Sequence, residues 1–440
     1  MSLPIVAIVG RPNVGKSTLF NRILGRSLAV VDDIPGITRD RHYAVVEWAG
    51  RSFRLVDTGG WVPEGIEAMD RRILTQVERA IEECDLVLFL VDARDGVQPH
   101  DQEIARELMR RGANAILVAN KVDSDRLEAD ASEFASLGLD GSPWTISAAQ
   151  GRGIGELLDV VVERIPTRAP ATTERAAGIR IAVLGRPNVG KSSIVNRLLG
   201  EERMIVDDVP GTTRDAIDTP FRWHGREMVL VDTAGIRRKL GSHPDFEFYA
   251  TLRAIRSLDS ADVALLVLDA NEPVRKQDLR IAKMIEEAGR GCVWVFNKWD
   301  LVEKSDNTAA QMLETVRAEI PFQAYAPAEF VSALTVQRIS RLPERIVQAY
   351  ESTQRKVATA ELNEVVRRAV DANPPKYVAG EKPVRIYYAT QVRTGPPTFA
   401  LFVSNPQRLA RDYERYLVHA LRGAFDFTGS PIRLQIRKST

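Results

Sequence analysis

The chain has 440 residues, 44% of them hydrophobic and 27% charged, which suggests about three globular domains with substantial cores. No apolar run approaches the ~18 residues of a membrane span, which excludes a membrane-spanning class. Cys84 and Cys292 are the only cysteines, which argues against a disulfide framework or zinc site. The net charge of +1 hides an asymmetry, because residues 351–440 carry 15 Lys and Arg against 8 Asp and Glu, a mild indication of a nucleic-acid partner.

The first predicted element is a strand that leads into a glycine-rich loop and a helix, and the chain carries this unit twice. The loop sequence GRPNVGKS occupies residues 10–17 and recurs unchanged at residues 185–192. Each copy follows a short apolar run and opens an amphipathic segment that we expect to end at Gly25 or Gly200. Strand, loop and helix in this order predict a phosphate-binding loop.

The residue types in this loop suit the chemistry of a bound triphosphate. Its glycines let successive backbone N–H groups turn toward the β-phosphate, and the helix N-terminus adds partial positive charge. Lys16 and Lys191 are expected to reach the β- and γ-phosphates, and the hydroxyls of Ser17 and Ser192 to hold magnesium.

Further landmarks recur in the same order, at separations of 175 to 185 residues. They are GITRD at Gly36 and GTTRD at Gly211, DTGG at Asp57 and DTAG at Asp232, NKVD at Asn120 and NKWD at Asn297, and Ser147-Ala148 and Ser332-Ala333. Such a repeat indicates a domain duplication.

Continuous apolar runs between these landmarks predict strands that are buried on both faces of a mainly parallel sheet. The runs cover residues 85–91, 115–119, 261–268 and 293–296. A Trp-x-Gly-Arg turn around Gly50 and again around Gly225 predicts an antiparallel hairpin at the sheet edge. Each copy is therefore expected to be an α/β nucleotide-binding domain, with a sheet flanked by helices.

The duplication and a change of composition set the expected domain boundaries. We expect a first domain at residues 1–164, a Pro-, Ala- and Thr-rich linker at 165–178, a second domain at 179–350 and a different domain at 351–440. In this last domain, apolar spacing predicts a helix at 362–370, strands at 384–388 and 399–403, a helix that Asn405 caps and Gly423 ends, and a strand at 432–436. The order α-β-β-α-β is that of an α+β KH-like domain.

Three more positions in each copy are expected to complete the magnesium and γ-phosphate contacts. A carboxylate that ends a strand beside the loop can fix magnesium, and a glycine N–H or a loop threonine can close on the γ-phosphate. The carboxylates are Asp57 and Asp232, the glycines Gly60 and Gly235, and the threonines Thr38 and Thr213.

The NKxD segments decide which base is expected. The carboxylates of Asp123 and Asp300 accept hydrogen bonds only, so they suit the N1–H and exocyclic amine of guanine, and adenine offers no such donors on that edge. A site built on such bonds rejects the base that lacks them by orders of magnitude. Both copies are therefore predicted to prefer GTP and GDP over adenine nucleotides.

The expected site residues follow from these motifs. In the first copy the nucleotide contacts are Gly10, Arg11, Pro12, Asn13, Val14, Gly15, Lys16, Ser17, Thr18, Asp57, Thr58, Gly59, Gly60, Asn120, Lys121, Val122, Asp123, Ser147 and Ala148. In the second copy they are Gly185, Arg186, Pro187, Asn188, Val189, Gly190, Lys191, Ser192, Ser193, Asp232, Thr233, Ala234, Gly235, Asn297, Lys298, Trp299, Asp300, Ser332 and Ala333. Those expected to act in catalysis are Lys16, Thr38, Gly60, Lys191, Thr213 and Gly235, and the magnesium set is Ser17, Thr38, Asp57, Ser192, Thr213 and Asp232.

Two such domains followed by a KH-like domain resemble one bacterial family, the Der (EngA) GTPases. The resemblance extends to PPTFALFV around Phe399 and to GSPIRLQIR near the end of the chain. It implies a GTP hydrolase that acts in assembly of the large ribosomal subunit. We expect a cytoplasmic monomer, since only two cysteines indicate a reducing compartment, and we expect its nucleotide state to control docking on rRNA. The resemblance also implies potassium activation, with Asn13 and Asn188 at the positions concerned.

Other features bear on rate and on partners. The position after DxxG that carries a water-orienting Gln in Ras-like enzymes is Trp61 in one copy and Ile236 in the other, which predicts slow intrinsic turnover. The last domain lacks a GxxG loop, so any RNA contact would fall to basic residues such as Arg385, Arg433 and Arg437. There are two alternative hypotheses. One is an interaction scaffold with structural GTP sites and a protein-docking tail, and the other is a tRNA-modification GTPase.

Overall fold

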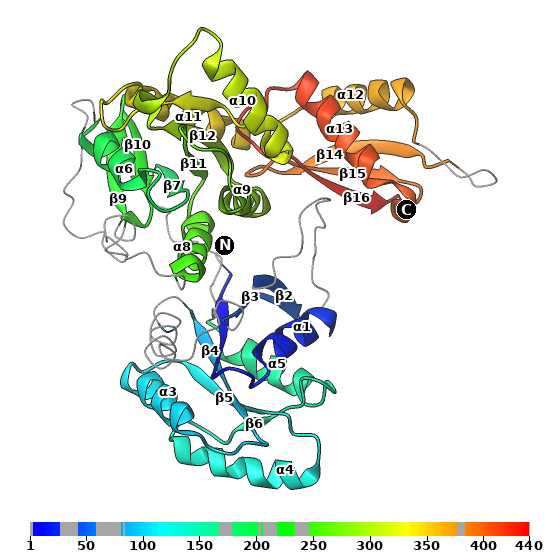
Figure 1. The fold of residues 1–440 in the computed structure, drawn as a ribbon. Helices are drawn as coiled ribbons and strands as arrows, with labels where there is room; N and C mark the ends of the chain where they lie inside the picture. Colours follow the sequence, from blue (N-terminus) through cyan, green and yellow to red (C-terminus); the bar gives the residue numbers. More distant parts are fainter. Residues whose placement is uncertain are drawn as a thin grey trace. The chain divides into compact units, whose positions relative to one another are not determined.

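The computed structural model describes residues 3–26, 43–58, 81, 84–166, 178–200, 204–205, 218–233, 246–375 and 383–439. The chain divides into two compact units. The first unit contains a six-stranded sheet, and the second contains a seven-stranded sheet and a three-stranded sheet (Figure 1). This is the expected fold class of two mainly parallel α/β sheets followed by a small α+β part.

The six-stranded sheet has the order β2-β3-β1-β4-β5-β6. Its strands are β1 (Ile5–Val9), β2 (Tyr43–Trp48), β3 (Arg51–Asp57), β4 (Leu86–Asp92), β5 (Ala115–Asn120) and β6 (Trp144–Thr145). All neighbours are parallel except β2 and β3, which form the predicted edge hairpin. Every residue of β1, β4 and β5 is buried, which explains why their sequences are continuous apolar runs.

Helices cover both faces of this sheet. Helices α1 (Lys16–Arg26) and α5 (Ile154–Arg164) pack on the face that includes Val6, Ile8 and Leu88. Helix α3 (Pro99–Arg110) and the 3-10 helix η3 (Ala131–Leu137), which follows α4 (Asp125–Asp130), pack on the face of Ala7, Val9 and Phe89. Because β3, β1, β4 and β5 are parallel, their carboxyl ends lie along one edge of the sheet, where the phosphate loop follows β1.

The seven-stranded sheet repeats this plan in the order β13-β12-β11-β7-β10-β9-β8. Its strands are β7 (Ile179–Leu184), β8 (Met204–Ile205), β9 (Thr219–Trp223), β10 (Arg226–Leu230), β11 (Val263–Asp269), β12 (Gly291–Asn297) and β13 (Ala328–Phe330). The helices are α6 (Lys191–Gly200), α8 (Phe246–Ser260), α9 (Lys276–Ala288), α10 (Thr308–Glu319) and α11 (Leu342–Gln354), with 3-10 turns η4 (Trp299–Leu301), η5 (Pro321–Gln323) and η6 (Ile339–Arg341). Helices α6 and α11 share one core with β7, β11 and β12.

Two details of the duplicated domains differ from the predictions. The hairpin of β9 and β10 does not end its sheet, because β8 pairs with β9 on the outside. Helix α1 continues through Gly25 to Arg26, since the burial of Leu19, Phe20 and Ile23 holds the helix and outweighs the weak helix propensity of glycine.

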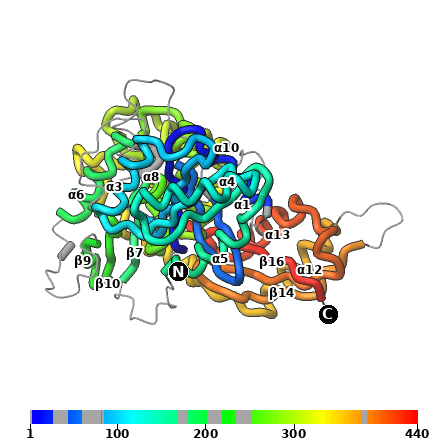
Figure 2. The backbone as a smooth tube through the Cα atoms, turned by 90° about the horizontal axis from the view of Figure 1, so that it is seen from below, coloured from blue at the N-terminus to red at the C-terminus, as the bar shows by residue number. Residues whose placement is uncertain are grey.

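The three-stranded sheet has the order β14-β15-β16, with β14 (Ile386–Arg393) antiparallel and β16 (Arg433–Lys438) parallel to the central β15 (Thr398–Val403). Helices α12 (Thr359–Ala372) and α13 (Arg411–Ala424) cover one face, as Figures 1 and 2 show. The order α-β-β-α-β is the predicted one.

Two predictions for this part were wrong in detail. A register shift between Ile386 and Tyr388 interrupts the predicted alternation, so Tyr388 is 45% exposed and Ala389 enters the core in its place. Asn405 caps the short 3-10 helix η7 (Pro406–Arg408), whereas α13 begins at Arg411 and runs through Gly423 to Ala424. Pro406 favours the short turn because its fixed φ suits a first helical position.

Within the second unit, the two sheets are joined by a backbone hydrogen-bond relay. The N–H of Cys292 at the start of β12 donates to the carbonyl of Gly429 at 2.8 Å, and the N–H of Gly429 donates to the carbonyl of Tyr325 at 2.9 Å. The N–H of Gly395 donates to the carbonyl of Thr353 in α11, also at 2.9 Å. These bonds attach two loops beside the three-stranded sheet to the second GTPase domain, one at the start of β12 and one at the end of α11.

Candidate nucleotide-binding sites

The phosphate loop of each copy has the same conformation. Lys16 Nζ donates to the carbonyls of Gly10 at 2.7 Å and Arg11 at 2.8 Å, and Lys191 Nζ donates to those of Gly185 at 2.8 Å and Arg186 at 2.6 Å. Burial lowers the pKa of both lysines to about 8. A phosphate placed in the loop would therefore meet a largely desolvated ammonium, whose attraction for an anion is strengthened by the low local dielectric.

The asparagine of NKxD ties the phosphate loop to the base-side loop. In the first copy, Asn120 Nδ2 donates to the carbonyl of Val14 at 2.8 Å, and Asn120 Oδ1 accepts from the N–H of Ala148 at 3.0 Å. Asn120 is buried at the end of β5, so this amide bridges three segments far apart in the sequence. Gly15 must remain a glycine here, because a Cβ at its φ of 97° would collide with the Asn120 amide.

The second copy reproduces this bridge. Asn297 Nδ2 donates to the carbonyl of Val189 at 2.8 Å, and Asn297 Oδ1 accepts from the N–H of Ala333 at 3.0 Å. A Cβ at Gly190 would meet the Asn297 amide in the same way. The bridge is thus a property of the motif rather than of one domain.

The next residue of NKxD is a lysine with left-handed backbone in both copies, with φ of 68° at Lys121 and 63° at Lys298. Each ammonium forms an ion pair with the aspartate that ends the preceding sheet strand, Asp92 or Asp269. This pairing holds the lysine stem beside the space in which a base would lie. Asp92 and Asp269 were not foreseen from the sequence, although their position as the last residue of an apolar strand was a usable signal.

The aspartates of NKxD have different surroundings in the two copies. The carboxylate of Asp123 accepts from Ser147 Oγ at 2.8 Å and pairs with the guanidinium of Arg94. The serine hydrogen bond, with Arg94 second, holds the pKa of this carboxyl below its usual range. Among the described residues no side chain bonds Asp300, and Ser332 Oγ instead accepts from the N–H of Thr335 at 3.1 Å.

The residues expected at magnesium come together in the first copy. Ser17 Oγ donates to Asp57 Oδ2 at 2.6 Å, which brings together a hydroxyl and a carboxylate, the oxygen donors that magnesium prefers. In the second copy Asp232 has a left-handed φ of 55° and accepts from Ser257 Oγ at 3.3 Å. The carboxylate of the DTxG segment is therefore oriented differently in the two copies.

Several residues that were expected to contact the nucleotide have side chains that are buried in the core or bonded within the protein. The side chains of Val14, Val122, Val189 and Trp299 are buried, so only their backbones are left for a nucleotide. Thr58 Oγ1 donates to the carbonyl of Ile8 at 2.7 Å. The exposed residues around the loops are Asn13, Ser17, Thr18, Pro187, Asn188, Ser192 and Ser193. Thr38, Gly59, Gly60, Trp61, Thr213, Ala234, Gly235 and Ile236 lie outside the described residues.

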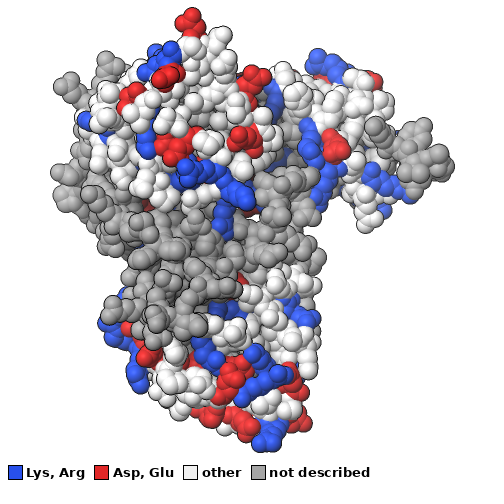
Figure 3. Space-filling model, viewed as in Figure 1, with Lys and Arg blue, Asp and Glu red and all other residues white. Residues whose placement is uncertain are grey.

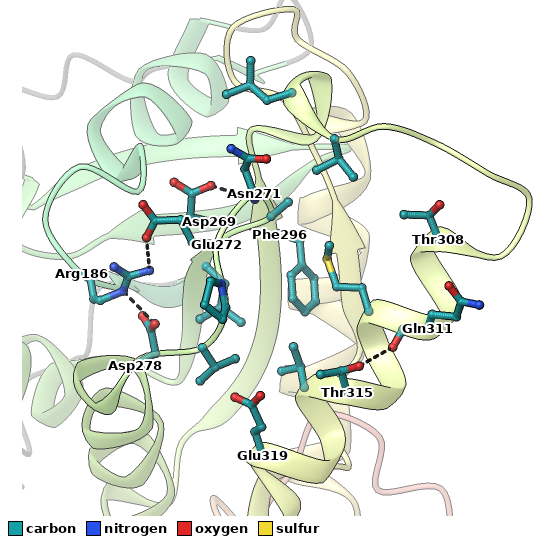
Figure 4. A pocket seen from close by; sticks show the side chains of 18 of the residues that line it. Arg186, Asp269, Asn271, Glu272, Asp278, Phe296, Thr308, Gln311, Thr315 and Glu319 are labelled. Carbon is teal, nitrogen blue, oxygen red and sulfur yellow. Dashed lines mark hydrogen bonds and ion pairs between the residues drawn. The ribbon is translucent and has the colours of Figure 1, made fainter.

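The arginine of each phosphate loop has acidic partners that the sequence did not predict. Arg186 Nε donates to Asp278 Oδ2 at 2.7 Å and its NH2 group to Glu272 at 3.0 Å, and Arg11 pairs with Asp95 at 2.7 Å and Asp101 at 3.4 Å. Beside Arg186 lies a pocket of about 680 Å³ between α9 and α10 (Figure 4). Asp278 stands in the first turn of α9, so this pair links the second phosphate loop to that helix.

Comparison with known proteins gives the identity of this arrangement. The family model described as "50S ribosome-binding GTPase" matches residues 5–121 and 180–298, and the model described as "KH-domain-like of EngA bacterial GTPase enzymes, C-terminal" matches residues 356–437. The protein "GTPase Der" of Caldanaerobacter subterraneus is 50% identical over 439 residues, which cover 100% of this chain and 99% of the relative. The chain belongs to the GTPase Der family.

Other relatives agree with this assignment. "GTPase Der" of Moorella thermoacetica is 51% identical and that of Desulforudis audaxviator 48% identical, each over 438 residues that cover 100% of this chain and 99% of the relative. The predicted tandem arrangement of two GTPase domains and a KH-like domain is thereby confirmed, and the chain is a GTPase. No helix in the described part of the chain has the length and apolar character needed to cross a membrane.

Proposed function

We propose that the protein hydrolyses GTP to GDP and phosphate at two sites, and that its nucleotide state governs docking on rRNA during assembly of the large ribosomal subunit. The observation that carries the nucleotide part is the buried amide bridge, in which Asn120 and Asn297 each bind a phosphate-loop carbonyl and a base-loop N–H. This bridge ties the phosphate cradle to the loop that carries Asp123 or Asp300. A guanine nucleotide has its charged and its hydrogen-bonding ends at the corresponding places.

Magnesium fits the first site, because the Ser17 hydroxyl and the Asp57 carboxylate already converge. When bound, the ion would supply positive charge that offsets the charge on the β- and γ-phosphates. Ser17 and Asp57, with Ser192 and Asp232 in the second copy, are the residues we propose to hold it, together with Thr38 and Thr213. Lys16 and Lys191 would add their charge to the same phosphate oxygens.

The base assignment is tested by exchanging the hydrogen-bonding character of the reading side chain. Asp123→Asn and Asp300→Asn replace one acceptor oxygen with a donor amide, which suits xanthine, whose 2-position carries an oxygen. We expect each variant to lose GDP affinity at its own site by at least tenfold and to gain XDP affinity, as measured by calorimetry with magnesium. Unchanged GDP binding in both variants, or equal binding of ADP by the parent protein, would refute the assignment.

Hydrolysis is proposed to be slow without a partner, because Trp61 and Ile236 stand where a water-orienting glutamine would act. We also propose that potassium stimulates it through Asn13 and Asn188, which share a left-handed φ of 64° at exposed positions of their loops. Phosphate release measured in potassium and in sodium at equal ionic strength tests this. Equal turnover in the two salts would contradict the role of potassium.

The KH-like domain is the proposed RNA-facing part. The face of its sheet that α12 and α13 leave uncovered carries Tyr388 stacked on Phe402, with ring centroids 4.3 Å apart, and Arg437 on β16, whereas Arg433 of the same strand donates to the carbonyl of Glu287 in α9. Basic side chains outnumber acidic ones over this part in the view of Figure 3. Aromatic and basic groups on one face suit phosphates and bases of single-stranded RNA.

The cellular role is tested by depletion. We expect cells that lack the protein to lose mature large subunits in sedimentation profiles, and we expect Lys16→Ala or Lys191→Ala to fail to restore them. A scaffold that needs only its fold would restore them regardless of nucleotide. Mature subunits at normal levels after depletion would refute the role in assembly.

We propose a monomer in the cytoplasm with four segments: 1–164, a linker at 165–178, 179–350 and 351–440. Helix α5 ends at Arg164 and β7 begins at Ile179, which supports the first two boundaries. The boundary at residue 350 falls inside α11, so we propose to extend the second domain to Gln354, where this helix ends.

A further inference from the structure

One difference between the two GTPase domains is a side chain beside the base-reading aspartate. Arg94 lies two residues after Asp92, which ends β4, and Asn271 lies two residues after Asp269, which ends β11. The loop has the same local geometry in both copies, because the N–H of each residue donates to the strand-end carboxylate at 3.0 Å. The difference is therefore confined to the side chain.

The guanidinium of Arg94 forms an ion pair with Asp123, the carboxylate that we propose to bind guanine. Its NH2 group pairs with Asp123 Oδ2, while Ser147 Oγ takes Oδ1. Asn271 has a short neutral side chain, and among the described residues none occupies Asp300. The asparagine bridge and the lysine ion pair match in the two copies, whereas Ser147 bonds Asp123 and its counterpart Ser332 does not bond Asp300.

A guanidinium and a guanine present the same kind of donor edge. Guanine offers N1–H and the exocyclic amine to the carboxylate, and arginine offers a planar fork of N–H groups. The two therefore compete for the same acceptor oxygens. Because the Arg94 side chain is 58% exposed, it can swing into solvent when a base enters.

We propose that Arg94 is a built-in competitor of the guanine ring at the first site, acting through Asp123, and that Asn271, at the corresponding position of the second site, is not one. This inference rests on the proposed guanine-reading role of the two aspartates. The Arg94–Asp123 pair must break before guanine binds, so the first site has the lower affinity for the nucleotide. The two domains then have different nucleotide occupancies at the same GTP concentration. An exposed ion pair biases such an equilibrium by at most about fivefold.

The experiment compares the two sites one at a time in the full chain, with GDP that carries a fluorescent N-methylanthraniloyl group as the probe. Lys191→Ala leaves the first site to be measured, and Lys16→Ala leaves the second. We expect Arg94→Asn to tighten the first site two- to fivefold, Arg94→Lys to have an intermediate effect, and Asn271→Arg to weaken the second site by a similar factor. Arg106→Asn, an exposed charge change on α3, is the matched control and should leave the first site unchanged.

Ionic strength separates competition from a structural effect. The Arg94–Asp123 pair is screened by salt, so the gain from Arg94→Asn should shrink between 50 mM and 500 mM KCl. An unchanged or weakened first site in Arg94→Asn, or a gain that salt does not alter, would overturn the inference while leaving guanine binding intact. If neither site of the parent protein takes up the probe, the proposed function fails and this inference fails with it.

Discussion

At the scale of single residues, the two asparagines of NKxD have the greatest influence on the sites. The Asn120 side chain satisfies the carbonyl of Val14 and the N–H of Ala148 in the interior, where an unpaired polar group is expensive. Its role is to join two loops, whereas the aspartate three residues later is left to read a ligand. The same division holds for Asn297 and Asp300.

The first prediction concerns this bridge. Asn120→Ala leaves two buried backbone groups without partners, so we expect the first domain to lose about 2–5 kcal/mol of unfolding free energy. Chemical denaturation followed by circular dichroism measures this, and nucleotide titration should show weaker binding at the first site only. Asn297→Ala is the counterpart and should affect only the second site. A loss of affinity at both sites from either substitution would contradict a local bridge.

At the scale of elements, α9 runs between the second phosphate loop and the KH-like domain. Asp278 in its first turn pairs with Arg186, and Glu286 near its end accepts a hydrogen bond from the Tyr325 hydroxyl. The guanidinium of Arg422, from α13, lies 4.2 Å from the centroid of the Tyr325 ring. The guanidinium of Arg433, from β16, donates to the carbonyl of Glu287 in α9, so this helix contacts a nucleotide-site residue at one end and the KH-like domain at the other.

The second prediction is a pH dependence at this end of α9. Burial raises the pKa of Glu286 to about 7, against an ordinary value of 4.5. The folded state therefore binds the proton more tightly than the unfolded state, and the stability present at low pH is lost as pH rises from about 4.5 to 7. Glu286→Gln keeps an acceptor for Tyr325 without the charge.

At pH 8 the parent carries the buried charge of Glu286 and the Gln variant does not, so we expect the variant to be more stable by about 1–3 kcal/mol. The residual contact of Glu286 with solvent limits this gain. At pH 4.5 the two proteins should be nearly equal. Urea unfolding at both pH values measures this difference. If the difference in unfolding free energy between variant and parent is the same at pH 4.5 and at pH 8, the shifted pKa is contradicted.

At the scale of the whole molecule, the second GTPase domain and the KH-like domain form one compact unit. Gly429 lies in their contact: its N–H donates to the carbonyl of Tyr325, and its carbonyl accepts from the N–H of Cys292. It has a φ of 80°, and a Cβ there would collide with Cα and Cβ of Ala349 in α11. Close backbone approach thus sets the position of the KH-like domain on the second GTPase domain.

The third prediction tests this contact. Gly429→Ala forces the two domains apart, whereas Gly225→Ala, at a φ of 77° with open space around it, incurs only the left-handed backbone penalty of about 1–2 kcal/mol. We expect Gly429→Ala to destabilise the unit by about 1–3 kcal/mol more than this control. Thermal unfolding and limited proteolysis between residues 354 and 359 measure the difference. Equal effects of the two substitutions would show that the contact is not tightly packed.

The sequence by itself determined the duplicated α/β fold, the phosphate loops, the preference expected for guanine and the order of elements in the KH-like domain. Local spacing carries these features, because loop glycines, apolar runs and acceptor side chains act through their neighbours in the chain. The boundaries were less well determined, as Gly25 and Gly423 show, since burial of the surrounding helix outweighed local propensity. The register shift before Tyr388 also has no signal in the local alternation.

Only the tertiary structure decided which side chains meet across loops. The pairing of Arg94 with Asp123, of Arg186 with Asp278 and of Gly429 with Ala349 joins segments separated by 29 to 92 residues. No local pattern encodes such contacts, because they arise when parallel strands place their carboxyl ends side by side and when helices close on the sheet. The two phosphate loops are the same in sequence, whereas the side chains near the NKxD aspartates differ, as Arg94 and Asn271 do, and only the fold brings Arg94 into contact with Asp123.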